Sequence, residues 1–195
     1  MLEVKYGETA LMRACDNGKV ECVKLLLEHG ADINAKDEDD CTALMIVCGA
    51  GQVECVKALL KHKGIDVNAR DKDDYTALMC ACNNGEVECA KFLLEHGADI
   101  NAISKKGFTA LRVACIKGEV ECVKLLLEHK DIYVNAEDED GFTALMRLIQ
   151  ELRVVCEEAL VNCKNAQKPK EQKIEKLSEE KLKIDNPTDE GGLGR

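Results

Sequence analysis

A ten-residue stretch that recurs at a fixed interval constrains this chain most strongly. The sequence Val-Glu-Cys-Val-Lys-Leu-Leu-Leu-Glu-His occupies residues 20–29 and returns unchanged at residues 120–129. Edited copies, VECVKALLKH and VECAKFLLEH, occupy residues 53–62 and 87–96, so the copies start at intervals of 33, 34 and 33 residues. A period of this size is typical of stacked repeats, in which each unit buries its apolar face against its neighbours. We therefore expect an array of repeats rather than a fold around one central core.

Each unit is predicted to contain two helices joined by a tight turn. A Thr-Ala-Leu triplet opens each unit, and its threonine is expected to cap the first helix by accepting an early backbone N–H. These threonines are Thr9, Thr42, Thr76, Thr109 and Thr143. In the first unit this predicts a helix over residues 10–17. The glycine nine residues after each of the first four threonines is expected to end that helix. The apolar face predicted for the second helix consists of Val20, Val23, Leu26 and Leu27.

The repeated motifs carry a family resemblance. Gly-x-Thr-Ala-Leu, a glycine nine residues on, Val-x-x-x-Lys-x-Leu-Leu and Gly-Ala-Asp-Ile-Asn-Ala together resemble the ankyrin repeat, over about residues 4–165. The resemblance implies an all-α ankyrin-repeat solenoid of stacked helix-turn-helix units with projecting loops. Within an array spanning residues 1–165, the implied units are about residues 7–39, 40–73, 74–106 and 107–140, followed by a degenerate C-terminal cap at 141–165. Residues 166–195 are expected to form a charged, flexible tail.

One departure from the ankyrin pattern bears on stability. The family's Thr-Pro-Leu-His is Thr-Ala-Leu-Met in four units and Thr-Ala-Leu-Arg in the unit that contains Arg112. In the family this histidine links neighbouring loops by hydrogen bonds. Its absence predicts weaker coupling between loops.

Charge and composition exclude several classes of function. The net charge of −10 argues against a nucleic-acid footprint and against docking on an anionic membrane surface. The sequence contains no apolar run long enough for a transmembrane helix. The first residues form no apolar leader, so we expect a cytoplasmic protein, with a nuclear location as the alternative. In such a compartment the 12 cysteines are expected to be thiols.

The cysteines form two columns, which predicts packing rather than chemistry. The first column is Cys15, Cys48, Cys82 and Cys115, and the second is Cys22, Cys55, Cys89, Cys122 and Cys156. A structural metal site needs four converging ligands, and the spacing supplies no such cluster. Buried cysteine behaves as a small hydrophobic residue, so we expect no metal and no cofactor. Because the two columns lie seven residues apart, the two cysteines of one repeat are expected to lie close together.

The histidines form a further column, His29, His62, His96 and His129, at the end of each second helix. There they are expected to interact favourably with the helix dipole.

The resemblance implies a protein-protein interaction scaffold or adaptor that binds another protein on a concave surface of loop tips and first helices. The sequence shows no nucleophile-base pair and no phosphate-binding loop, so we predict no enzyme activity. The candidate partner-binding residues are Tyr75, Phe108, Phe142, Lys105, Lys106, Ile116 and Lys117. Three of the chain's six aromatic residues stand in the column before the threonines, and aromatic residues are enriched in interface hot spots. The lysine pair would receive an acidic group of a partner.

Several alternatives stay open at this point. Phe108 and Phe142 would instead be structural if they pack on adjacent loops. The chain would act as a regulatory inhibitor if it masks a partner enzyme or transcription factor. A thiol-based metal or redox protein is a more distant alternative. We expect a monomer, with weak self-association through the N-terminal repeat face as an alternative, because Arg13 replaces an apolar residue there.

Overall fold

Four pairs of α-helices make up residues 7–135, the part of the chain that the computed structural model describes. The helices are α1 (Ala10–Asp16), α2 (Val20–Glu28), α3 (Ala43–Gly49), α4 (Val53–Leu60), α5 (Ala77–Asn83), α6 (Val87–Glu95), α7 (Ala110–Lys117) and α8 (Val120–Leu127). Within residues 7–135 the only β-type pairing is a single antiparallel bridge between Lys36 and Thr42. The predicted all-α stack of helix-turn-helix units is confirmed. The predicted C-terminal cap, the tail and the fifth threonine lie outside the described residues.

Each first helix begins at a threonine cap. The Oγ1 atom of Thr9 accepts the backbone N–H of Met12 at 3.2 Å, and that of Thr109 accepts the N–H of Arg112 at 3.2 Å. Thr42 and Thr76 make the same bond to the third residue of their helices at 3.4 Å. Because the first N–H groups of a helix have no partner within the helix, these bonds stabilise the start of each unit. The predicted caps are confirmed at all four described positions.

The turns between paired helices require glycine. Gly51 and Gly85 have φ values of 67° and 72°, in the left-handed region that side chains disfavour. A Cβ atom at Gly51 would also meet the carboxylate of Glu86, which would have to move aside. The predicted turn glycines are therefore confirmed by their backbone conformation.

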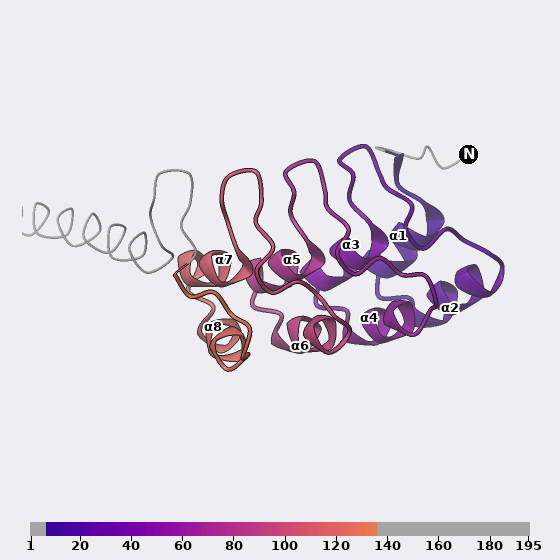
Figure 1. The fold of residues 1–195 in the computed structure, drawn as a ribbon. Helices are drawn as coiled ribbons and strands as arrows, with labels where there is room; N and C mark the ends of the chain where they lie inside the picture. The colour runs from indigo at the N-terminus through magenta and orange to yellow at the C-terminus, as the bar shows by residue number, and fades with distance from the viewer. Residues whose placement is uncertain (1–6, 136–195) are drawn as a thin grey trace, which may run out of the picture. The chain divides into compact units, whose positions relative to one another are not determined.

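The helices form two rows, with the aliphatic core between them. Helices α1, α3, α5 and α7 lie side by side in one row, and α2, α4, α6 and α8 form the other (Figure 1). Leu44, Leu59, Leu78 and Leu93, drawn from both rows, are buried. The connectors that precede α3, α5 and α7 all project on the side of the first row (Figure 1). In α2, Val23 and Leu27 are buried, which confirms the centre of the predicted apolar face.

Short polar side chains hold the connectors in shape. The Oδ1 atom of Asp71 accepts the backbone N–H groups of Asp73 and Tyr75, both at 2.8 Å. Asp37 makes the equivalent pair of bonds one repeat earlier, and the Oγ atom of Ser104 accepts a bond one repeat later. These side-chain bonds satisfy backbone N–H groups that have no partner in a helix or sheet, at the point where the chain reverses direction.

Asparagines link neighbouring repeats, which the sequence analysis did not anticipate. The Nδ2 atom of Asn68 donates to the carbonyl of Gly97 at 3.1 Å, and its Oδ1 atom accepts the N–H of Asp99 at 2.7 Å. Asn34 and Asn101 make the same two bonds to the repeats that follow them. Each connector is thereby coupled to the next without the family's histidine.

Replacing Asn68 with alanine is expected to lower the free energy of unfolding by about 1–2 kcal/mol, because both bonds across the junction are lost. Urea denaturation of the native chain and the variant measures the change. Asn17 is a matched control, since its amide donates only to the carbonyl of Arg13 in its own helix. Equal losses for Asn68→Ala and Asn17→Ala would show that the bonds between repeats add nothing.

Candidate partner-binding surface

The two described aromatic residues of the predicted surface are held at the bases of their connectors. Tyr75 and Phe108 stand immediately before Thr76 and Thr109, and both are half-buried. The backbone N–H of Phe108 donates to Ser104 Oγ at 3.1 Å. Tyr75 packs against the core, so part of its surface is structural. Phe142 lies outside the described residues.

Arg112 lies close to both aromatic side chains. Its guanidinium carbon is 4.4 Å from the centre of the Phe108 ring, a cation–π distance, and its Nη1 atom donates to the carbonyl of Gly107 at 3.4 Å. Burial, chiefly, raises the pKa of the Tyr75 hydroxyl, while the positive charge of Arg112 acts in the opposite direction. Phe108 therefore packs on an arginine of its own repeat, which differs from the alternative in which it packs on an adjacent loop.

Sequence reasoning did not place Arg112 in the site, although a signal was present. The equivalent residues Met12, Met45 and Met79 are buried in the other described repeats. Arg112 is only 6% exposed, so the guanidinium replaces a buried thioether. A charged residue in a column of methionines was the feature that could have identified it.

The basic residues of the predicted surface divide into two places. Lys105 and Lys106 lie exposed at the tip of a connector. The Nζ atom of Lys105 donates to the carbonyl of Lys72 in the preceding connector, so this lysine also links loops. Ile116 and Lys117 lie at the other end of α7, about 10 Å along the helix axis from its start. The structure thus places the aromatic residues and the lysine pair on the connector side, and it does not place Ile116 and Lys117 beside them.

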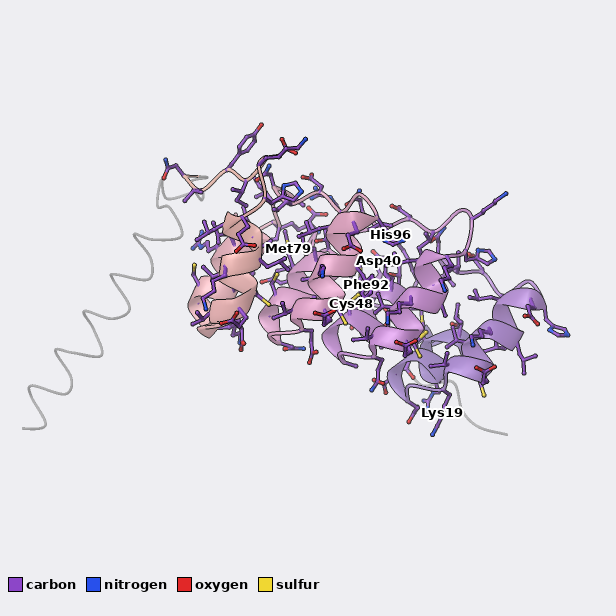
Figure 2. The ribbon with its side chains drawn as sticks, turned by 90° about the horizontal axis from the view of Figure 1, so that it is seen from below. Lys19, Asp40, Cys48, Met79, Phe92 and His96 are labelled. Carbon is purple, nitrogen blue, oxygen red and sulfur yellow. The ribbon has the colours of Figure 1, made fainter. Side chains whose placement is uncertain are left out.

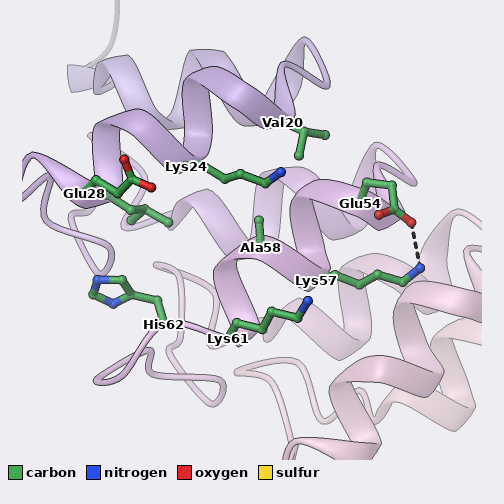
Figure 3. A pocket seen from close by; sticks show the side chains of 9 residues that line it. Val20, Lys24, Glu28, Glu54, Lys57, Ala58, Lys61 and His62 are labelled. Atoms are coloured by element: carbon green, nitrogen blue, oxygen red, sulfur yellow. Dashed lines mark hydrogen bonds and ion pairs between the residues drawn. The ribbon is translucent and has the colours of Figure 1, made fainter.

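Two grooves, which the sequence analysis missed, lie between helices of the second row. The α2–α4 groove encloses about 560 Å³ and is shown in Figure 3. Its lining residues are Val20, Lys24, Leu27, Glu28, Glu54, Lys57, Ala58, Lys61 and His62. The α6–α8 groove encloses about 290 Å³, with Lys91, Leu94, Glu95, Leu125, Glu128 and His129 as its lining.

The cysteines pair between repeats rather than within one, which corrects the sequence expectation. Cys82 and Cys122, from consecutive repeats, are hydrogen-bonded, and that bond and burial raise the pKa of Cys82. In the same way Cys15 lies near Cys55 of the following repeat. Both pairs join a cysteine of a first helix to a cysteine of the second helix in the following repeat.

Burial makes most of these thiols unreactive. It raises the pKa of Cys15 to about 12 and that of Cys89 to about 11, and it raises the pKa of Cys48, labelled in Figure 2, well above 9.0. Since the thiolate is the nucleophile and the metal ligand, a raised pKa disfavours both roles. In the second column Cys22 is exposed, and the hydrogen bond with Cys82 lowers the pKa of Cys122. Within residues 7–135 no three His, Cys, Asp or Glu side chains are grouped as metal ligands.

The histidine column divides in two. The Nδ1 atoms of His29 and His96 donate to the carbonyls of Leu25 and Phe92 at 2.8 Å, which supports the predicted role at a helix end (Figure 2). His129 differs, because its Nδ1 atom lies 3.3 Å from the backbone N–H of Asp131 and accepts from it.

Among the described residues, the N-terminal face of the first repeat exposes apolar side chains. Leu25 is 55% exposed, and Cys22 is exposed although its equivalents in the next three repeats are buried. Arg13 reaches Glu8 at 3.0 Å on the same repeat. Self-association through this face stays a prediction, and sedimentation at high concentration tests it.

Comparison with known families decides the classification. The family described as ankyrin repeats (3 copies) matches residues 2–37, 11–104 and 101–172. The chain belongs to the ankyrin repeat family. A search of curated proteins finds no significant match. Ankyrin repeats generally bind other proteins and are typically not enzymes. Of the helices described in this array, none has the length and hydropathy to cross a bilayer.

Proposed function

We propose that this ankyrin array is a cytoplasmic scaffold or adaptor that binds another protein through its connectors and first helices. The observation that carries the proposal is the arrangement of Phe108 and Tyr75 around Arg112. The ring of Phe108 is partly exposed, yet its backbone is tied to Ser104 and its ring lies against a buried guanidinium. A side chain already fixed in place loses little conformational entropy when a partner binds.

The proposed contact surface comprises Tyr75, Phe108, Phe142, Lys105 and Lys106, with Ile116 and Lys117 as a separate contact at the other end of α7. Lys106 is exposed and makes no hydrogen bond or ion pair with a described residue, so its ammonium is available to a carboxylate of the partner. Aromatic anchors surrounded by charged residues are the usual composition of an energetically important contact. We propose that residues 1–165 form the array and that residues 166–195 form a separate tail.

The experiment is capture of binding proteins from cell extract by the full chain and by Phe108→Ala. Loss of a hot-spot aromatic costs at least about 2 kcal/mol, which corresponds to roughly 30-fold weaker binding. Glu88→Ala is the control, because Glu88 is exposed on α6, in the other row of helices. Thermal unfolding of each variant separates lost binding from lost structure. Equal capture by the native chain and a folded Phe108→Ala variant would remove this surface from the proposal.

A further inference from the structure

Two residues at the α2–α4 groove depart from the repeat, one within α4 and one at its C-terminal cap. The stretch at residues 53–62 differs from the stretch at residues 20–29 only at Ala58 and Lys61. The other three copies carry leucine or phenylalanine where Ala58 stands, and glutamate where Lys61 stands. Both departures line the groove. They explain its size, since the equivalent α6–α8 groove, with Leu125 in place of alanine, has about half the volume.

The helix on the other side of each groove is the same. Lys24, Leu27 and Glu28 of α2 correspond to Lys91, Leu94 and Glu95 of α6. The two grooves therefore share one wall. They differ where Ala58 is replaced by Leu125 and where Lys61 is replaced by Glu128. Ala58 lies at the centre of the ring of labelled side chains, with Lys24 on one side and Lys61 on the other (Figure 3).

The charge of the groove changes sign between the two places. Three lysines and two glutamates line the α2–α4 groove, whereas one lysine and two glutamates line the α6–α8 groove. Lys24 and Lys57 are already paired, with Glu21 at 2.7 Å and Glu54 at 2.6 Å. No hydrogen bond or ion pair within the described residues engages Lys61. The positive charge of Lys61, which acts on Glu54 without a direct ion pair, thus stands at the edge of an apolar depression in a chain whose net charge is −10.

Between these two grooves, α4 and α6 are joined by a contact of an aromatic ring with a lysine. Phe92 takes the place of Ala58 in the next repeat, and the Nζ atom of Lys57 lies 5.0 Å from the centre of its ring. The second row of helices therefore already contains one contact between a lysine and an aromatic ring. The α2–α4 groove presents the same surroundings with the ring missing.

We infer that the α2–α4 groove binds an acidic peptide segment of a partner protein, with a large apolar side chain seated over Ala58 and a carboxylate on Lys61. The depression supplies the apolar contact, and its volume is within the range of about 300–1,000 Å³ that is usual for binding pockets. Opposite charge across an interface fixes the orientation of the peptide and raises its association rate. This surface belongs to the second row of helices, so the inference does not depend on the surface proposed around Phe108.

The test is selection of randomised displayed peptides on the full chain and on Ala58→Leu/Lys61→Glu. This double substitution turns residues 53–62 into the stretch already present at residues 20–29 and 120–129, so the variant is expected to fold. Peptides with a large apolar residue flanked by Asp or Glu are expected to be enriched on the native chain. Their affinity for the double variant is expected to be at least about tenfold lower. Circular dichroism and thermal unfolding verify the fold, and Lys61→Glu alone serves if the double variant is unstable.

A reciprocal variant tests the same inference by gain of binding. Leu125→Ala/Glu128→Lys gives α8 the two departures of α4, opposite a helix that carries the same lysine, leucine and glutamate. A second site for the selected peptides is expected, measured as increased stoichiometry by calorimetry. Several outcomes would overturn the inference: enrichment of basic peptides, no enriched peptide that depends on Ala58 and Lys61, or binding of dodecanoate in place of any peptide. Unchanged peptide binding by Phe108→Ala would keep it separate from the proposed function.

Discussion

Raising the pH from about 7 to about 10 is expected to lower the free energy of unfolding by about 4 kcal/mol through three buried thiols alone. These thiols are Cys15, Cys48 and Cys89, none of which is exposed to solvent. Burial, the main cause in each, raises the folded-state pKa to about 12 for Cys15, to about 11 for Cys89 and well above 9.0 for Cys48. At a pH one unit above the pKa of the unfolded state, each thiol lowers the free energy of unfolding by about 1.4 kcal/mol.

The direction of the effect follows from proton binding. In the unfolded chain a cysteine releases its proton near pH 9, whereas in the folded chain these cysteines keep theirs. Above pH 9 the folded state therefore binds more protons, and stability falls as pH rises. The loss begins near the unfolded pKa and ends only when the pH passes the folded pKa. Below about pH 8 these thiols give no pH dependence, because they are protonated in both states.

The measurement is urea denaturation at several pH values between about 7 and 10, with the slope of stability against pH as the readout. Cys48→Ala removes one titrating thiol and is expected to make the slope near pH 10 shallower by about 1 kcal/mol per pH unit, with no change below about pH 8. Cys22→Ala is the control, because Cys22 is exposed although it occupies the same repeat position as the buried Cys89. Using the slope avoids any dependence on how much each substitution changes stability at neutral pH. A slope that is the same in all three proteins would show that the buried thiols titrate normally.

The interval between copies was sufficient to predict the fold, because a fixed interval shows that every unit has nearly the same length and the same pattern of helices. A threonine before an apolar triplet predicts a helix start wherever it occurs, and Thr9, Thr42, Thr76 and Thr109 all act as caps. Glycine at the turns is required by local backbone conformation, which depends little on neighbouring repeats. These features are local, and local features can be inferred from one sequence.

Contacts between repeats were harder to predict, because they depend on how neighbouring units stack. The pairing of Cys82 with Cys122 across a junction follows from which helix faces which, and spacing within one repeat pointed to the wrong partner. The bonds that Asn68 makes to the next repeat were missed for the same reason. The α2–α4 groove needed both kinds of information: the sequence shows that Ala58 and Lys61 are unusual, and only the structure shows that they share one depression.

Replacing Leu93 with alanine is expected to lower the free energy of unfolding by about 2–5 kcal/mol, the usual cost of truncating a leucine in a packed core. Leu93 is 0% exposed and belongs to α6, which packs against α4, α5 and α8. The substitution therefore removes contacts within one repeat and across both of its junctions. In a repeat protein stability is approximately the sum of unit and junction contributions, so a central position weakens both. The cavity left behind adds to the lost transfer energy because closely packed helices relax only in part.

Leu25→Ala provides the matched comparison, since it makes the same chemical change on another second helix where the side chain is 55% exposed. Its expected cost is within about 0.5 kcal/mol, because a surface side chain loses little buried area. Denaturation by guanidinium chloride measures both variants, and an unchanged dependence on denaturant would show that the surface exposed on unfolding is the same. Leu93 and Leu25 variants of equal stability would contradict a core shared by the two rows of helices. A loss confined to Leu93 would instead show that this row is stabilised by the side chains that it buries in the core, since the two leucines differ in burial and in the helix face that they occupy.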